Sequence, residues 1–497
     1  MTASQITAAP IKHPGRFYIG GDWVVPSTSD VIDVIQPATE EIYLQVAEAK
    51  PADVDRAVAA ARLAFDEGPW PFMAPAERAG YLRGIAEGLR KRQAEVAHTW
   101  ASEMGILHSD AEVRGARIPG IYEFYANLAD NFEWVERHTP AGGGFGWLAR
   151  EPVGVVGAIV PWNAAVVALS FKLAPALLAG CSIVLKSSPE APSAGYLLAE
   201  IAEEIGIPAG VVNIVTAHRP ASEALVVNPG IDKVSFTGST AAGKRIAALC
   251  AERVARVNLE LGGKSAALIL DDYDIEKAAA SLADSTMELT GQVCSALSRV
   301  IVSKNRHDEL VEALSAEFAK VRVGDPFDAS NDMGPVAAQR QRDSIEGLIG
   351  KGIEEGATLA AGGHRPDGLD RGWFIEPTLF ANVDNQSTIA RNEFFGPVLS
   401  VIPAENEEDQ IRLANDSPYG LNSAVFTEDD DRAWRFARRI RSGTVGQNAH
   451  RNSHAFAFGG FKQSGIGREG GREGLMPYLE PKAIILDREP SEAPKQK

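Results

Sequence analysis

Short apolar runs alternate with amphipathic stretches through the middle of the chain. From Val153 onward, runs rich in Val and Ile predict strands at 153–160, 182–186, 211–215, 233–236 and 257–261. The spacing of apolar residues between them predicts helices at about 168–179, 193–205 and 241–252, with a short helix after 215. Short apolar strands separated by helices are typical of a parallel sheet with both faces covered. The pattern therefore places the protein in the α/β class.

Segments on either side extend this organisation. Residues 51–68 and 74–93 have the periodicity of two amphipathic helices, which we expect to pack on the same sheet. A second alternating series runs from Ser265 to about Asn448 and predicts a second α/β unit. A Gly-rich extended stretch at 139–150 fits neither series, and we expect the charged tail from Arg488 to be disordered.

The stretch from Val153 to Phe171 contains no charged residue and is long enough to span a bilayer. Pro161 and Asn163 at its centre argue against a membrane helix. A buried strand, a polar turn and a buried helix explain the same residues, so no membrane association is predicted.

Length, net charge and cysteine content predict the number of domains, exclude one class of partner and indicate the cellular location. A chain of 497 residues predicts two or three domains. The net charge of −17 argues against a nucleic-acid partner, which requires clustered basic residues. Three cysteines are too few for a disulfide framework and the N-terminus lacks the apolar core of a secretion signal, so a cytoplasmic location is expected.

The segment "VSFTGSTAAGKR" at 234–245 has the glycine and lysine spacing of a nucleotide triphosphate loop. Arg245 stands where such loops carry the Ser or Thr that binds magnesium, and a guanidinium cannot bind a cation. An apolar strand, a turn of small residues and a helix start remain, which favour an anion at the helix N-terminus. The segment therefore predicts a phosphate-bearing ligand and argues against an ATPase or kinase.

Two other patterns do not match the context that their function requires. The segment Gly465–Gly470 has the G-x-G-x-x-G spacing, but it does not open a strand–helix–strand unit, because the chain ends soon afterwards. His450 and His454 are four residues apart, but no Glu follows the first His. We interpret them as unrelated histidines in a loop and predict no metal site.

Cys294 and Glu260 have the local surroundings of reactive residues. Cys294 lies among small residues in "TGQVCSALSR", where it could be an inert core residue or a nucleophile. Glu260 ends an apolar strand and precedes two glycines, where it could cap a turn or act as a base. Ligands of parallel sheets bind beyond the carboxyl ends of the strands. The residues predicted there are Pro161, Trp162, Asn163, Lys186, Gly238 and Ser239.

Taken together, these segments resemble the aldehyde dehydrogenase superfamily along nearly the whole chain. The resemblance rests on "FYIGGDWV", "VGVVGAIVPWN", "FKLAPALLAG", "FTGSTAAG", "LELGGK", "GQVCSALSR", "EFFGPV", "YGLNSAVFT" and "FGGFKQSGIGRE", which occur in the family's order. It implies two doubly wound parallel-sheet domains and a small β oligomerisation element. The implied boundaries are 1–133 with 151–261 for the cofactor-binding domain, 262–470 for the catalytic domain, and 134–150 with 471–497 for the oligomerisation element and tail.

The resemblance also implies roles for individual residues. Cys294 would be the nucleophile and Glu260 the general base, while the Asn163 side chain and the Cys294 backbone N–H would form the oxyanion hole. Lys172 and Glu469 match positions thought to relay protons. Lys186 would bind the adenosine ribose of a nicotinamide cofactor, Glu393 the nicotinamide ribose, and Phe395 would pack on the nicotinamide. The implied cofactor-binding set is Pro161, Trp162, Lys186, Gly238, Ser239, Gly243, Glu393 and Phe395.

The implied reaction is NAD(P)-dependent oxidation of an aldehyde to an acid through a cysteine adduct and a thioester. Pro189 occupies the position where the family commonly carries a ribose-binding Glu, and the acid moves to Glu190. This departure leaves NAD and NADP as alternatives. We expect NAD, because Glu190 supplies a negative charge nearby and no further Lys or Arg adjoins Lys186. Two alternatives are a CoA-acylating relative, against which Glu260 argues, and a non-catalytic structural homologue.

The substrate and the assembly are predicted from two further sets of segments. The residues that match the family's substrate tunnel are mostly apolar or small, and Arg451 is the one permanent cation among them. They are Ala164, Val167, Phe171, Val293, Ser295 and the stretch 448–458. This composition predicts uncharged aldehydes of medium size. The stretches at 139–150 and 478–487 match the family's oligomerisation strands, so a homodimer or homotetramer is expected.

Overall fold

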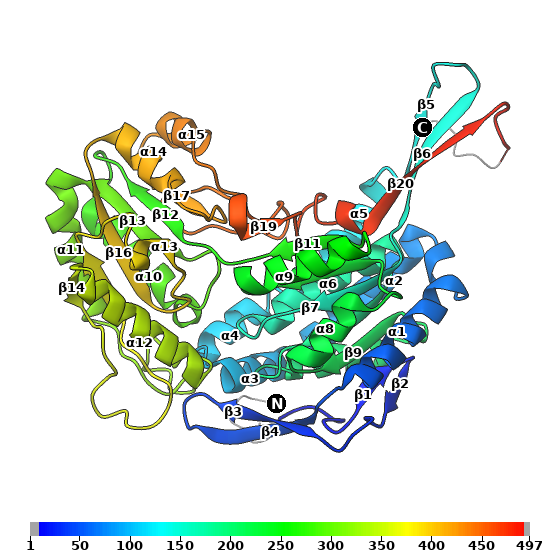
Figure 1. The fold of residues 1–497 in the computed structure, drawn as a ribbon, viewed down its shortest axis with the longest axis horizontal. Coiled ribbons are helices and arrows are strands. Elements are labelled where there is room, and N and C mark those ends of the chain that lie inside the picture. Colours follow the sequence, from blue (N-terminus) through cyan, green and yellow to red (C-terminus); the bar gives the residue numbers. More distant parts are fainter. Residues whose placement is uncertain (1–8, 492–497) are drawn as a thin grey trace.

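The computed structural model describes residues 9–491, and it consists of two α/β units with a β-sheet arm projecting from one of them (Figure 1). The first unit holds an eight-stranded sheet in the order β19-β11-β10-β7-β8-β9-β1-β2. Its central strands from β11 to β9 are parallel, while β19 at one edge and the β1–β2 pair at the other run antiparallel to their neighbours. The strands are β1 Phe17–Ile19, β2 Asp22–Val24, β7 Val155–Ile159, β8 Ser182–Ser187, β9 Val212–Thr216, β10 Lys233–Thr237, β11 Arg256–Glu260 and β19 Gly465–Ile466.

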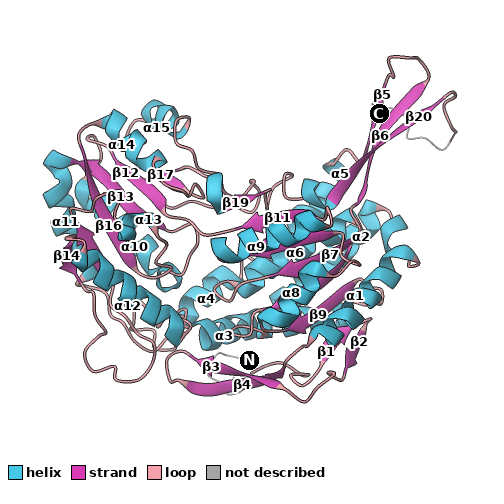
Figure 2. Cartoon of the chain, in the orientation of Figure 1, coloured by secondary structure: helices cyan, strands magenta, loops and turns pink. Residues whose placement is uncertain are grey.

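The alternation predicted from Val153 onward is confirmed within a few residues at each boundary. The central strands β7, β8 and β9 are buried along their whole length, as their apolar composition requires. Helices cover both faces of the sheet (Figure 2). Those that contact it are α1 Pro51–Asp66, α6 Ala165–Ala179, α7 Ser193–Glu204, α8 Arg219–Val227 and α9 Thr240–Glu252, while α3 Gln93–Met104, α4 His108–Gly115 and α5 Pro119–Asn131 pack mainly on other helices.

The uncharged stretch from Val153 to Phe171 forms β7, a turn and the start of α6, as predicted. Within residues 9–491, no helix combines the length and the apolar character needed to cross a bilayer.

The two amphipathic helices near the N-terminus lie in different layers. Helix α1, Pro51–Asp66, packs against β8 and β9. Helix α2, Pro75–Lys91, packs mainly on α5, α6 and α7, so the expectation that it lies on the sheet was wrong. The reason is that α6 and α7 already cover this face, and Gly88 of α2 lies so close to Ile201 of α7 that a Cβ there would be 2.6 Å from the Ile side chain.

The second unit contains a seven-stranded sheet in the order β14-β15-β16-β13-β12-β17-β18. All neighbours are parallel except β14 and β15. Its strands are β12 Ser265–Ile269, β13 Leu297–Ser303, β14 Thr358–Ala361, β15 Thr378–Ala381, β16 Val398–Ala404, β17 Ser423–Phe426 and β18 Gly446–Gln447. Its helices are α10 Ile275–Met287, α11 Lys304–Phe318, α12 Gln339–Glu354, α13 Thr388–Arg391, α14 Glu407–Asn415 and α15 Asp430–Ala437.

The arm is a three-stranded antiparallel sheet made from two distant parts of the sequence. Strand β6, Phe145–Pro152, pairs with β5, Val135–His138, and with β20, Leu479–Leu486. Both stretches predicted as oligomerisation strands thus lie in this sheet, which extends away from the two units (Figure 1). Beyond it, Glu489 forms an ion pair with Arg137 at 3.0 Å, and residues 492–497 of the predicted tail lie outside the described residues. A hairpin of β3, Val31–Gln36, and β4, Glu41–Ala47, was not anticipated.

Candidate active site

Polar residues gather where neighbouring parallel strands of the first sheet end. Lys186 pairs in register with Ile159 at the end of β7, and Glu260 pairs with Thr237 at the end of β10. Asn163 follows β7, and Gly238 and Ser239 follow β10. The predicted placement at one edge of the sheet is therefore confirmed.

Cys294 lies on a tight loop between the short 3₁₀ helix η3, Glu288–Gly291, and β13. Gly291 has a φ of 69°, and a Cβ there would lie 2.2 Å from the backbone of Gly396. A Cβ on Gly263 would lie 2.4 Å from the carbonyl oxygen of Cys294. Glycine at these two positions lets the loop approach its neighbours closely, which fixes the position of the thiol.

Asn163 and Gln292 hold the loop on the side that precedes the cysteine. The Asn163 side-chain amide donates to the Gln292 carbonyl at 2.8 Å, and the Gln292 side chain accepts from the Ala337 backbone N–H at 2.9 Å. A side-chain amide has two N–H groups, so Asn163 keeps a second donor. Gln292 is fully buried and was not identified from the sequence. The available signal was a polar side chain in a segment of small residues.

The residue Cys294 is partly exposed, whereas Cys181 and Cys250 are fully buried. Burial and the neighbouring carboxylates Glu393 and Glu260 raise the pKa of Cys294 above its usual range. The backbone N–H groups of Ser295 and of Cys294 itself act in the opposite direction. The raised pKa favours the neutral thiol, so formation of the thiolate requires a base.

Glu260 is 3% exposed, and neither carboxylate oxygen has a hydrogen-bond partner among the described residues. Burial is the main cause that raises its pKa well above the usual value, and Glu469 adds to the effect. A carboxylate that capped a turn would accept backbone N–H groups, so the geometry does not support capping. A buried, unpartnered carboxyl with a raised pKa matches a general base.

Behind Glu260, Lys172 and Glu469 form an ion pair. Lys172 is completely buried, and its ammonium also donates to the Ser235 hydroxyl at 3.2 Å. The Tyr478 hydroxyl lies 3.4 Å from the same Ser235 oxygen. The two predicted relay residues are therefore in direct contact.

Glu393 and Phe395 come from the second unit and border the same region. Glu393 accepts the Gly263 backbone N–H at 3.3 Å, and burial raises its pKa to about 7. Phe395 adopts a φ of 51° and lies edge-on to Trp162, with ring centroids 5.3 Å apart. Because non-glycine residues rarely adopt this φ, the strained Phe395 marks a position with a specific requirement.

Lys186 and the turn after β10 have unused polar atoms. Lys186 is buried, burial lowers its pKa to about 8, and its ammonium makes one long contact, 3.4 Å, to the Ala217 carbonyl. The hydroxyls of Thr237 and Thr240 are buried without a partner among the described residues. Ser239 caps α9, since its hydroxyl accepts the Ala242 N–H. These orphaned donors fit the ribose and phosphate groups of a dinucleotide.

The structure gives Gly243 a packing role. Its N–H donates to the Ser239 carbonyl inside α9, and a Cβ would lie 2.4 Å from the Leu261 side chain. Pro161 lies beside Trp162 in the turn that follows β7.

A cation that the sequence analysis missed reaches the predicted ribose site from the second unit. Arg340 at the start of α12 forms an ion pair with Glu190 at 2.7 Å. Ser188 donates to the other oxygen of Glu190. The two ends of this contact are far apart in the sequence, so no local signal could reveal it.

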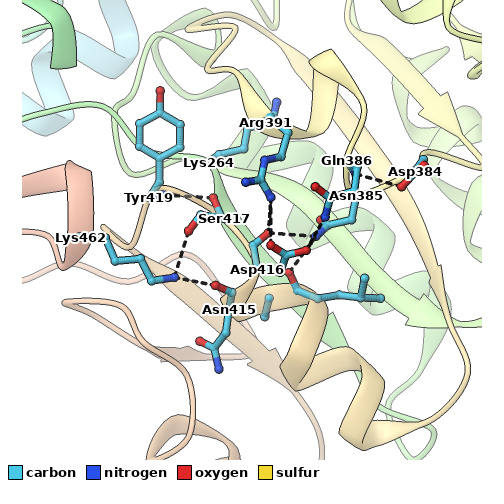
Figure 3. A network of polar contacts seen from close by, with 12 residues as sticks. Lys264, Asp384, Asn385, Gln386, Arg391, Asn415, Asp416, Ser417, Tyr419 and Lys462 are labelled. Atoms are coloured by element: carbon cyan, nitrogen blue, oxygen red, sulfur yellow. Dashed lines mark hydrogen bonds and ion pairs between the residues drawn. The ribbon is translucent and has the colours of Figure 1, made fainter.

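A polar network in the second unit lies close in sequence to Glu393 (Figure 3). The Lys462 ammonium donates to the carbonyls of Asn415 and Ser417 at 2.6 and 3.1 Å, and Arg391 pairs with Asp416 at 3.0 Å. These contacts tie the "FKQSG" segment to the loop at 415–419. Lys264 lies above the network, with its ammonium 4.5 Å from the Phe394 ring centroid, and burial lowers its pKa to about 7.

The segments set aside in the sequence analysis have other structural roles. Gly465 and Ile466 form β19 and pair antiparallel with the end of β11, so this glycine motif is an edge strand. His450 lies 3.0 Å from the Ser295 hydroxyl, and His454 lies edge-on to Phe124. Across residues 9–491, no group of His, Cys, Asp and Glu has a metal-binding arrangement.

Residues 23–484 match the aldehyde dehydrogenase family. The chain is 41% identical to geranial dehydrogenase of Castellaniella defragrans over 472 residues, which cover 95% of this chain and 98% of the relative. The structure of a Mycobacterium tuberculosis aldehyde dehydrogenase with NAD+ superposes with a TM-score of 0.93 at 44% identity and covers 97% of this chain and 99% of that one. A Pseudomonas syringae aldehyde dehydrogenase C, a cysteine-to-alanine variant bound to NAD+ and octanal, gives 0.93 at 36% identity, with 98% and 100% covered.

A family match over almost the whole chain and full-length relatives of this similarity agree with the geometry of the site. The chain belongs to the aldehyde dehydrogenase family, the NAD(P)-dependent oxidoreductases that act on aldehydes.

Proposed function

We propose that Cys294 is the nucleophile and Glu260 the hydrolytic base of an NAD-dependent aldehyde dehydrogenase that releases a free acid. The observation that carries this assignment is a partly exposed cysteine together with a buried carboxyl whose two oxygens have no partner among the described residues. Glu260 also raises the pKa of the thiol, so the two groups interact electrostatically.

The residues at the dinucleotide edge fit NAD, which relatives of this chain bind. Lys186 and Glu393 would hold the two riboses, the Thr237–Thr240 turn the pyrophosphate, and Phe395 with Trp162 the nicotinamide. Bound there, NAD supplies an acceptor for the hydride of the substrate. The Arg340–Glu190 pair places opposite charges near the adenosine ribose, so NADP stays possible.

The chain's own groups carry the remaining chemistry. The Cys294 thiolate adds to the aldehyde carbon, and the free N–H of Asn163 donates to the oxygen on which negative charge develops. Once a thioester is present on Cys294, Glu260 removes a proton from water, and the resulting hydroxide attacks the thioester carbon and releases the acid. The buried Lys172–Glu469 pair next to Glu260 would pass that proton onward.

We further propose that the substrate is an uncharged aldehyde of medium size. Arg451, the one permanent cation that the sequence places in the tunnel segments, is exposed and donates to the Gln447 carbonyl of its own loop at 3.0 Å. A distal carboxylate on the substrate would therefore lose water without gaining an ion pair, which costs several kcal/mol. Geranial and octanal, named for two relatives, are uncharged.

The proposed assembly is a homodimer or homotetramer, and the proposed location is the cytoplasm. The arm has an open edge and exposes Ile485 and Leu486, which a partner subunit would cover. The three cysteines are free thiols, as a reducing compartment favours.

The decisive experiment is NAD reduction with an aldehyde, with and without coenzyme A, in the wild type and in Cys294→Ala. We expect turnover without coenzyme A, none in Cys294→Ala, and unchanged NAD binding by the variant. A strict requirement for coenzyme A would support the acylating alternative, and no turnover with any aldehyde would support the structural one. Cys250→Ala is the matched control, because Cys250 is buried away from the site.

A further inference from the structure

The residue that follows the nucleophile is held by a hydrogen-bonded chain of side chains. The Ser295 hydroxyl lies 3.0 Å from Nε2 of His450 and 3.3 Å from the side-chain nitrogen of Asn452. Asn452 also contacts Nε2 of His450 at 3.2 Å. Ser295, 2% exposed, is thus anchored by two residues that lie more than 150 positions further along the chain.

A backbone N–H group fixes the donor and the acceptor of each hydrogen bond among these side chains. The Ser423 N–H donates to the Asn422 side-chain oxygen at 2.7 Å, so the Asn422 nitrogen is the donor to the Asn452 oxygen at 3.0 Å. The Asn452 nitrogen must therefore face both Ser295 and His450. Because that nitrogen only donates, Nε2 of His450 is an acceptor, and the Ser295 hydroxyl donates to it.

Two charged groups hold the other side of His450. Nδ1 lies 3.4 Å from a Glu288 oxygen, and the second Glu288 oxygen pairs with Arg114 of α4 at 2.6 Å. The proton of His450 therefore sits on Nδ1, toward Glu288, which fixes the ring orientation. His450 and Arg114 both favour the ionised form of Glu288 and lower its pKa. Asp110 is a further acid near this group.

The backbone N–H of the anchored residue, like that of Cys294 itself, stabilises the thiolate form of the Cys294 sulfur and acts to lower its pKa. Glu260 and Glu393 face the sulfur and act in the opposite direction. We propose that His450 is a positioning residue, which through the Ser295 hydroxyl keeps the Ser295 N–H directed at the Cys294 sulfur. The proposal rests on the assignment of Cys294 as nucleophile only for its catalytic consequence, because the geometry concerns the thiol itself.

The test is the pH dependence of the rate at which iodoacetamide alkylates Cys294, measured without substrate. His450→Asn keeps a donor for Glu288 but is too short to reach Ser295. We expect its alkylation rate near neutral pH to fall about fivefold, the effect of losing roughly one hydrogen bond to the thiolate, with the profile displaced to higher pH. Gln can place an amide oxygen close to the position of Nε2, so His450→Gln should restore most of the rate.

Two further variants identify the route of the effect. Ser295→Ala should reproduce the displacement, and the double variant with His450→Asn should show no further change, because both act through one contact. The matched control is His454→Asn, in the same loop but in contact with Phe124, which should leave the profile unchanged. Cys294→Ala supplies the blank for the two buried thiols.

An unchanged profile in His450→Asn, or additive effects in the double variant, would overturn the positioning role. That result is separate from a failure of the proposed function, which would appear as turnover in Cys294→Ala. A general loss of folding would lower the melting temperature of both His450 variants and remove the difference between Asn and Gln, which would also count against the proposal.

Discussion

The Lys172 ammonium and the Glu469 carboxylate form a buried ion pair behind the unpartnered carboxyl of Glu260. The two charges act on Glu260 in opposite directions: Glu469 raises its pKa and Lys172 lowers it. The pair therefore affects the pH at which the Glu260 carboxyl ionises.

Removing Lys172 and removing Glu469 should displace the pH profile of turnover in opposite directions. Glu260 acts as a base only when ionised, so turnover should rise with pH through its pKa. Lys172→Met removes the charge that lowers this pKa, and we expect the rise to move to higher pH with a loss of about 3–5 kcal/mol in unfolding free energy. Glu469→Gln should move the rise to lower pH. Profiles of kcat against pH and urea unfolding measure both effects, and displacement in the same direction would contradict this account.

Glu260→Gln should separate the two halves of the reaction. The amide cannot remove a proton from water, while the thiolate, the Asn163 donor and the cofactor site are unchanged. Rapid mixing should show a burst of reduced cofactor of about one per site, followed by turnover slowed by roughly 100-fold, within the usual range for a general base. Equal losses in the burst and in the steady state would show that Glu260 is not the hydrolytic base.

Straight-chain aldehydes should be oxidised with a kcat/KM that rises with chain length until the tunnel is full. Each buried methylene contributes at most about 0.8 kcal/mol. Benzaldehyde should be accepted, and succinic semialdehyde should be poor because the tunnel offers its carboxylate no free cation. If the semialdehyde is preferred more than tenfold, Arg451 must turn into the tunnel, and Arg451→Gln should then abolish the preference.

Cofactor preference should depend on the Glu190–Arg340 pair. We expect NAD to have the higher kcat/KM, because Glu190 repels a 2′-phosphate. Glu190→Gln should improve NADP use and Arg340→Gln should reduce it, each by about tenfold, with NAD much less affected. Raising the salt concentration should shrink both effects, since Arg340 is largely exposed. Equal changes for NAD and NADP would mean that the pair has a structural role and does not discriminate between a 2′-hydroxyl and a 2′-phosphate.

Light scattering should show two or four subunits at micromolar concentration. Ile485 of β20 is 66% exposed in the single chain, so Ile485→Lys should shift the population toward the monomer if a partner covers the arm. The charge-conserving control is Lys482→Arg, on the same strand and exposed. A wild-type monomer would contradict the proposed assembly.

The first sheet could be predicted almost strand by strand because its apolar runs are short, rich in Val and Ile, and separated by helices. Helix α2 was placed in the wrong layer, since an apolar helical face is the same whether it meets a sheet or other helices. At the site, Cys294, Glu260 and Asn163 lie in motifs that can be recognised locally. Gln292, Arg340 and His450 take their roles from partners distant in sequence, so only the folded chain reveals them.

Tyr478 connects the arm to the buried charge cluster, because it immediately precedes β20 and its hydroxyl contacts the Ser235 hydroxyl, which also accepts from the Lys172 ammonium. The ring of Tyr478 also lies under Lys233, 5.0 Å from its ammonium. Deleting the chain from this point would remove a wall of the buried charge cluster together with an arm strand. The C-terminal strand is therefore not a transferable module: a truncation or a chimera that exchanges it should admit water to the Lys172–Glu469 pair and change turnover even where the subunits still assemble.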